Sequence, residues 1–179
     1  MTDLKGKTIA MLATDGFEQS ELLDPKQRLE KLGARVEVIS PDGKQKIRGW
    51  KEKNWGDEVA VDQALSEADP ADYDALVLPG GVINPDNLRR EPKAIAFIQA
   101  MAKANKPIAA ICHGPWLLAE SNLVKGRRLT SWASVKTDLT NAGGQWQDSE
   151  VVVDGNLITS RNPSDIPAFS DAIAKAVAG

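Results

Sequence analysis

The single cysteine and the single histidine of the chain are neighbours, Cys112 and His113, in the stretch KPIAAICHGPWLLAE (residues 106–120). A thiolate is a strong nucleophile and an imidazole is a base near neutral pH, so the pair has the residue types of cysteine-dependent covalent catalysis. The alternative is a structural one, because a lone cysteine often serves as a small buried apolar residue. The position of the pair favours chemistry, because an apolar run ends at Cys112 and Gly114 and Pro115 follow at once.

The pair is expected on a sharp turn between a strand and a helix. PIAAIC is a short apolar run typical of a buried strand, and GPWLLAE has the pattern of a helix start. Such a turn presents a nucleophile at the carboxyl edge of the sheet, as the G-x-S-x-G elbow of hydrolases does. The first free amides of the helix would point at the sulfur, so we expect them to lower the pKa of Cys112.

The rest of the chain alternates between strand-like and helix-like segments. Residues 7–14, 35–40 and 75–81 are short apolar runs, and LLDPKQRLEKLGA (residues 22–34) has leucines at helical spacing. VVVDGNLITS (residues 151–160) predicts a hairpin about Asp-Gly, and a last helix closes the chain. The alternation predicts an α/β fold with a doubly wound, mostly parallel sheet and helices on both faces.

Two segments need separate interpretation. Residues 41–62 are polar and contain several glycines, and we interpret them as a small β excursion. The whole chain, residues 1–179, is then a single α/β domain, which suits its length. Pro25 is expected in the first turn of its helix or at a kink, because proline cannot donate the helical hydrogen bond.

Composition and charge exclude several classes of function. The chain is 42% apolar and 26% charged, its net charge is −3, and its basic residues are scattered, so neither nucleic acid nor a membrane is expected as a partner. No signal peptide or membrane-spanning run is visible, and one cysteine cannot form a disulfide within the chain, which suits the cytoplasm. One Cys and one His cannot complete a structural zinc site, and no phosphate-binding loop or dinucleotide motif occurs, so neither a metal nor a cofactor is expected.

Three motifs together resemble a known family. ALVLPGG, AAICHGPWLLAES and EVVVDGN are similar to segments of the PfpI-type intracellular protease and deglycase family. This family lies in the superfamily of the parkinsonism-associated deglycase and has the class I glutamine amidotransferase-like fold. The resemblance extends from about Thr8 to the C-terminus. It implies a flavodoxin-like sheet and a homodimer or higher homo-oligomer with the active site near the subunit interface.

The resemblance also implies a carboxylic acid beside the cysteine, and it selects Glu18 in DGFEQSE. Glu18 would be protonated and donate a hydrogen bond to the thiolate, so its pKa would be raised and the pair would titrate as a unit. Asp15 and Glu21 lie close by, and sequence spacing alone does not choose among the three. The alternative for Glu18 is a solvated loop residue or a charge near a helix start.

A histidine from a distant loop, as in a classical triad, is not present in this sequence. His113 must therefore serve Cys112 directly and needs a third group to orient its ring. The resemblance assigns this role to a carboxylate of a neighbouring subunit, which corresponds to Asp86 in GGVINPDNLRR. Asp86 also suits a cap or a first-turn acid of its own helix, and the two roles are compatible.

The remaining candidates concern substrate binding. The amides of Gly80 and Gly81 would form an oxyanion site, or the two glycines would form a plain turn. Trp116 would either wall the pocket or pack in the core. Trp132 stands where close relatives usually carry tyrosine, so any proton role of that tyrosine is absent here.

These residues predict a stress-response, cysteine-dependent hydrolase. The resemblance implies peptidase activity, repair of glycated amines or hydration of glyoxals, and all three begin with addition of the thiolate to an electrophilic carbon. The substrate would be a small molecule, a peptide or a glycated protein. The alternative is a redox sensor or holdase that uses oxidation of Cys112 with little turnover, although the chain has no second thiol to resolve a sulfenic acid.

Overall fold

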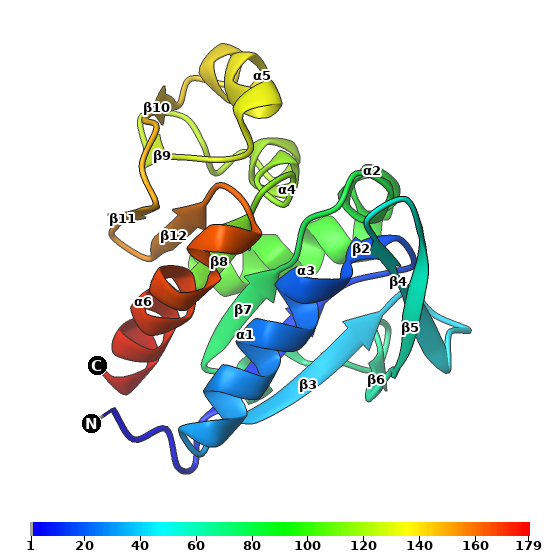
Figure 1. The fold of residues 1–179 in the computed structure, drawn as a ribbon. Coiled ribbons are helices and arrows are strands. Elements are labelled where there is room, and N and C mark those ends of the chain that lie inside the picture. Colours follow the sequence, from blue (N-terminus) through cyan, green and yellow to red (C-terminus); the bar gives the residue numbers. More distant parts are fainter. Residues whose placement is uncertain (1) are drawn as a thin grey trace.

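A computed structural model describes residues 2–179, which form a central sheet of seven strands with helices on both faces (Figure 1). All neighbouring strands of this sheet pair in parallel except β11 and β12, which form the expected hairpin. The doubly wound α/β architecture is therefore confirmed. In spatial order the strands are β11 (Val151–Asp154), β12 (Leu157–Ser160), β8 (Ile108–Ile111), β7 (Ala75–Leu78), β1 (Thr8–Leu12), β3 (Arg35–Ser40) and β6 (Gln63–Ala64).

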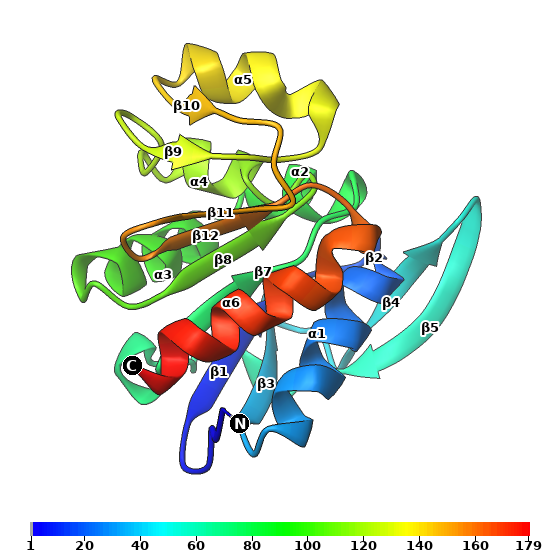
Figure 2. The same ribbon diagram turned by 60° about the vertical axis from the view of Figure 1, so that its left-hand side comes forward.

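The helices enclose a hydrophobic core on each face of the sheet. They are α1 (Gln19–Lys31), α2 (Ile83–Leu88), α3 (Pro92–Lys103), α4 (Trp116–Glu120), α5 (Lys136–Asn141) and α6 (Ile166–Ala178), with short 3-10 helices at Pro70–Asp72, Ala133–Val135 and Pro163–Asp165. Helices α1 and α6 lie side by side over one face (Figure 2), where Leu22 and Phe169 are fully buried. Helices α3 and α4 supply Ile98 and Leu117 to the core on the other face. No helix within residues 2–179 is long and apolar enough to cross a bilayer.

Two small sheets lie outside the central one. The strands β2 (Phe17–Glu18), β4 (Lys46–Lys51) and β5 (Asn54–Ala60) form one of them, and β9 (Arg128–Leu129) and β10 (Gln145–Trp146) form the other. The β4–β5 hairpin accounts for most of residues 41–62, so this segment is the small β excursion that the sequence predicts. Figure 2 shows the hairpin standing away from the central sheet.

Helix α1 begins earlier than the leucine spacing suggests. It starts at Gln19, and Pro25 lies inside it and is buried. Proline at this position removes the hydrogen bond to the carbonyl of Glu21, which lies in the first turn, so only one backbone bond near the helix start is affected. The extra turn is what carries Glu21 into the protein interior.

The loops that follow β1, β7 and β8 meet at the carboxyl edge of the sheet, where open α/β sheets place their ligand sites. Asn84 fastens two of these loops together. Its Oδ1 accepts a hydrogen bond from the amide of Thr14 at 2.8 Å, and its Nδ2 donates to the carbonyls of Pro79 and Gly80 at 3.0 and 3.2 Å. Asn84 therefore holds the loop after β1 and the loop after β7 together next to the end of β8.

Candidate active site

Cys112 occupies a strained turn directly after β8, as the sequence predicts. Its φ is +62°, a left-handed conformation that is costly for a residue with a side chain. The surrounding backbone holds it there: the Cys112 amide donates to the carbonyl of Ser160 at 3.1 Å, and its carbonyl accepts from the amide of Trp132 at 2.9 Å. Helix α4 follows, with Pro115 at its N-cap position.

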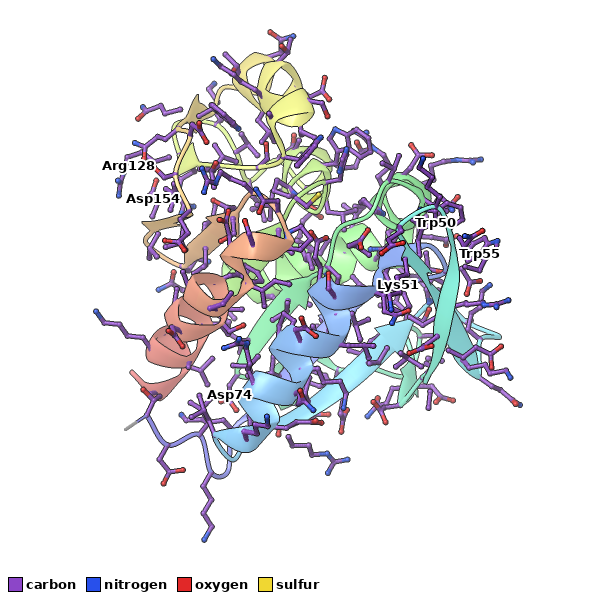
Figure 3. The ribbon with its side chains drawn as sticks, in the orientation of Figure 1. Trp50, Lys51, Trp55, Asp74, Arg128 and Asp154 are labelled. Carbon is purple, nitrogen blue, oxygen red and sulfur yellow. The ribbon has the colours of Figure 1, made fainter. Side chains whose placement is uncertain are left out.

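A cavity of about 530 Å³ opens at this turn, and Cys112 lies in its wall. Most of the exposed lining is apolar, and its ionisable groups come from β2, from the first turn of α1, from the tip of the β4–β5 hairpin and from the turn after β8. Figure 3 shows Trp50 and Trp55 on that hairpin. The lining residues are Gly16, Glu18, Glu21, Trp50, Glu52, Gly81, Val82, Ile83, Cys112, His113, Trp132 and Pro163.

The ring of His113 lies against the sulfur. Its Nδ1 is 3.2 Å from Sγ of Cys112, and the ring is held between Trp116, edge-on at 5.0 Å, and Trp132, stacked at 6.4 Å. Burial lowers the pKa of His113, because the imidazolium would lose its hydration in this buried position. The imidazole therefore stays neutral at physiological pH, and with the proton on Nε2 its Nδ1 accepts a proton from the thiol.

The carboxyl group beside the sulfur belongs to Glu21, which corrects the expectation for Glu18. The Glu21 side chain is fully buried, its Oε1 accepts a hydrogen bond from the Gly80 amide at 3.1 Å, and it interacts with the thiol of Cys112. Glu18 lies in β2 at the N-cap of α1, where it is half-buried and lines the cavity. The reason is helical phase, since Glu21 shares the buried stripe of α1 with Pro25 and Leu29.

Glu21 and Cys112 form a coupled pair. Burial raises the pKa of Glu21 to about 8, and the nearby charge of Glu18 adds to the effect. Burial also raises the pKa of Cys112, and the charge of Glu21 raises it further. Two anions in one buried pocket repel each other strongly, so the pair carries at most one negative charge over the physiological range.

The expected lowering of the pKa of Cys112 is therefore wrong. The amides of His113 and Gly81 do favour the thiolate, but desolvation and the neighbouring Glu21 outweigh them and keep the pKa of the thiol raised. A thiol of this kind reacts through removal of its proton by a base during attack. Neutral His113, with Nδ1 at 3.2 Å, is the base in contact with it.

The two glycines after β7 have different roles. The amide of Gly80 donates to Glu21 and so is not a free oxyanion donor, which corrects part of the prediction. A side chain at Gly80 would place its Cβ 2.5 Å from Oε1 of Glu21 and 2.8 Å from Cβ of Cys112. The amide of Gly81 faces the sulfur, and its φ of +81° together with its contact with Gly16 requires glycine.

The tryptophans that wall the cavity are Trp50 and Trp132, and Trp116 does not line it. Trp116 packs behind His113, donates from Nε1 to Asp138 at 2.8 Å, and has Arg89 over its ring at 5.5 Å. Trp116 also packs against the hydrophobic core on this face of the sheet, so the alternative of core packing is confirmed and the pocket wall is wrong.

Asp86 lies in the first turn of α2 and is exposed, with no side-chain cap bond at that helix start. The structure of one chain brings together Cys112, His113, Glu18 and Gly81 at the cavity, and Asp86 is not among the residues that line it. The resemblance implies that Asp86 contacts His113 of a neighbouring subunit, and this contact stays a prediction. Among residues 2–179, no cluster of three or more His, Cys, Asp or Glu side chains is arranged to hold a metal ion.

The fold is a doubly wound α/β sheet, and the site combines a cysteine on a strained strand–helix turn with a neighbouring histidine and a buried acid. Together they define a class of α/β proteins with a cysteine at the site. The profile of the DJ-1/PfpI family matches residues 7–176, and the chain belongs to this family. It is 40% identical over 164 residues to putative cysteine protease YraA of Bacillus subtilis, covering 92% of this chain and 94% of that protein. It is 41% identical over 165 residues to protein/nucleic acid deglycase 2 of Escherichia coli, covering 92% and 94%.

Solved structures agree with this assignment. The crystal structure of Drosophila melanogaster DJ-1beta superposes on the chain with a TM-score of 0.87 at 29% identity, and the match covers 97% of this chain and 91% of that one. The family assignment and the flavodoxin-like fold that the sequence resemblance implied are both confirmed.

Proposed function

We propose that the protein is a stress-response, cysteine-dependent hydrolase that acts on glycated amines or peptides in the cytoplasm. The observation that carries the proposal is the sulfur of Cys112, held on a strained turn at a cavity wall with Nδ1 of His113 at 3.2 Å. The names of the relatives, a deglycase and a putative cysteine protease, support the same class of chemistry.

The reaction begins when His113 Nδ1 takes the thiol proton and Sγ forms a bond to the electrophilic carbon of the substrate. The carbon–oxygen π bond breaks, and its electron pair becomes an oxyanion, for which the amides of Gly81 and His113 near the sulfur are the nearest donors. The imidazolium then gives the proton to the leaving group while the carbon–oxygen π bond re-forms and the bond between the carbon and the leaving group breaks. His113 next takes a proton from water, whose oxygen bonds to the carbon and regenerates the oxyanion. The π bond re-forms again, the carbon–sulfur bond breaks, and the imidazolium returns the proton to the sulfur, which restores the thiol.

Glu21 contributes through its coupling to the thiol. While Glu21 is protonated, it adds no charge that would oppose a negative sulfur, and its proton is a donor to that sulfur. Above about pH 8, where Glu21 ionises, its charge opposes the thiolate. We therefore assign Glu21 the role that the resemblance implied for an acid at this site.

The exposed apolar residues Val82, Ile83 and Trp132 surround the cavity mouth. Such a patch suits contact with a second copy of the chain, and Asp86 on the neighbouring α2 is exposed beside it. We propose a homodimer or higher homo-oligomer in which Asp86 of one subunit orients His113 of another.

The function is tested by assaying wild type and Cys112→Ser side by side on a peptide, on methylglyoxal and on a methylglyoxal-treated cysteine derivative. We expect wild type to turn over at least one substrate class and Cys112→Ser to lose at least a hundredfold in kcat, because serine is a far weaker nucleophile in this setting. Equal activity of the two proteins would exclude a cysteine mechanism. Oxidation of Cys112 by peroxide without any turnover would favour the redox alternative.

A further inference from the structure

Apart from Cys112 and His113, the ionisable side chains that line the cavity are all acidic. They are Glu18, Glu21 and Glu52, and no lysine or arginine lines it. Within residues 2–179, no salt bridge joins these three carboxyl groups to a basic side chain. A site that binds a carboxylate or a phosphate needs positively charged hydrogen-bond donors such as lysine or arginine. This cavity has none in its lining, so it favours positively charged ligands over negatively charged ones.

A second observation also points to a ligand. Oε2 of Glu21 is buried and has no hydrogen-bond partner in standard geometry, although the other oxygen is bonded to Gly80. A buried polar atom without a partner is costly unless a bound molecule or the sulfur completes it. Glu21 lines the same cavity as Glu18 and Glu52, but it is fully buried and is protonated below about pH 8, so the negative charge of the lining comes from Glu18 and Glu52.

Aromatic rings complete the arrangement. Trp50 and Trp132 line the cavity, and an indole face attracts an ammonium or guanidinium group. Trp50 is fixed by its cross-strand pair with Trp55, whose ring meets it edge-on at 5.3 Å. Glu52 follows at the hairpin turn with φ +57°, and this turn places Glu52 in the lining of the cavity together with Trp50.

We propose that the cavity selects substrates that carry a positive charge next to the reacting carbon, with Glu52 and Trp50 as specificity-determining residues. Carbonyl adducts near basic amino-acid side chains, and peptides with such side chains, belong to this class. Anionic carbonyl compounds are disfavoured. The inference rests on the proposed function for its biological meaning, but the charge preference itself is a property of the cavity around Cys112.

The preference is measured on the thiol directly, without turnover. Methanethiosulfonates transfer their RS group to a thiol: the sulfur of Cys112 forms a disulfide bond, the S–SO₂ bond breaks, and methanesulfinate leaves with the electron pair. Two reagents of similar size are compared at pH 7.0, one with a trimethylammonium group and one with a sulfonate. The chain has a single cysteine, so mass spectrometry of the intact protein reports modification at Cys112 alone. The intrinsic rate ratio of the reagents is taken from 2-mercaptoethanol.

Wild type is expected to favour the cationic reagent about tenfold more than 2-mercaptoethanol does, which corresponds to charges a few ångströms away in a partly solvated site. Glu52→Gln is expected to reduce this preference about threefold. Trp50→Leu is expected to slow the cationic reagent while the anionic rate stays within twofold. Addition of 1 M salt is expected to weaken the preference in wild type, because the Debye length falls to about 3 Å.

Glu58→Gln is the matched control. Glu58 is exposed on β5 of the same hairpin and does not line the cavity, so its loss changes the net charge equally and should leave the ratio unchanged. A wild-type ratio equal to that of 2-mercaptoethanol would overturn the inference. So would equal effects of Glu52→Gln and Glu58→Gln. Failure of the proposed hydrolase is a separate outcome, seen as absent turnover in a protein whose charge preference at Cys112 is intact.

Discussion

The carboxyl group of Glu21 and the thiol of Cys112 share one buried pocket, and both crowd the backbone of Gly80. A Cβ at Gly80 would lie 2.5 Å from Oε1 of Glu21 and 2.8 Å from Cβ of Cys112. The helix start, the end of β7 and the end of β8 are thus packed together at a single point. Because both groups are acids in a desolvated place, the protonation of one depends on the other.

Glu21 is expected to make stability depend on pH. Its folded-state pKa is raised from 4.5 to about 8, so its contribution is fully present below pH 4.5 and is lost as the pH rises through about 8. Glu21→Gln removes this titration. In urea unfolding, the free energy of unfolding of the variant should therefore rise relative to that of wild type between these pH values, by up to about 1.4 kcal/mol per pH unit.

Glu67→Gln is the control for this measurement, because Glu67 is an exposed carboxyl group. Its stability should follow that of wild type across the same range. A constant difference between Glu21→Gln and wild type from pH 4.5 to pH 8 would show that Glu21 ionises in the folded protein as it does in the unfolded chain.

Gly80→Ala is expected to slow both turnover and alkylation of Cys112 at least tenfold. The added methyl group would overlap Glu21 and would lie 2.7 Å from the carbonyl oxygen of Ile111, so one of these groups must move. Overpacking of this kind costs about 1–3 kcal/mol of stability. Gly43→Ala is the comparison, since the Cβ at Gly43 would meet nothing within 4 Å; Gly43 has a φ of +84°, so this variant carries backbone strain but no overlap. Normal alkylation in Gly80→Ala would refute the close packing of this pocket.

In Asp86→Ala, where no carboxylate of a neighbouring subunit faces the ring, His113 is expected to titrate below the ordinary value of about 6.5, because burial lowers its pKa. The chain has one histidine, so in a tag-free protein its NMR signal is unambiguous. Trp132→Ala removes one of the two rings that cover the imidazole and should raise the midpoint toward 6.5. Trp55→Ala, which changes an exposed tryptophan of the hairpin, should not. A midpoint above 6.5 in wild type that falls in Asp86→Ala would be the effect of the neighbouring subunit's carboxylate on the ring. A midpoint above 6.5 that persists in Asp86→Ala would contradict the effect of burial.

Mixing subunits tests whether Asp86 acts across an interface. Asp86→Ala and Cys112→Ser subunits are combined, and heterodimers are verified by native mass spectrometry. One of the two sites in each heterodimer then joins a wild-type Cys112 to a wild-type Asp86, so activity should recover to about half of the wild-type value per dimer. Verified heterodimers without recovered activity would limit Asp86 to its own helix.

Much of the fold follows from local patterns in the sequence. β3 (Arg35–Ser40) has the predicted bounds, because a short apolar run with β-branched residues has no competing helical interpretation. The hairpin of β11 and β12 follows from Asp-Gly between two apolar runs. The turn at Cys112 follows from the apolar strand that ends there and from Gly-Pro after it, since both features are local.

The site was predicted less completely, because its partners meet through tertiary contacts. Glu21 was not selected, although a carboxyl group at the spacing of Pro25 and Leu29 is an anomaly on a buried helical face and would have identified it. The role of Gly80 depends on that error, since its amide bonds to Glu21. Trp50 gave no signal, because it lies on a hairpin that approaches the elbow only in three dimensions.

The coupling of Cys112 to Glu21 is tested most directly by the rate of iodoacetamide alkylation as a function of pH in wild type, Glu21→Gln and Glu18→Gln. Burial and the charge of Glu21 raise the pKa of Cys112, with Glu18 a smaller influence. The wild-type midpoint should therefore lie above the free-cysteine value of about 8.5. It should fall in Glu21→Gln and fall less in Glu18→Gln. A midpoint unchanged by Glu21→Gln, or a larger shift in Glu18→Gln, would contradict the coupling and return the acid's role to Glu18.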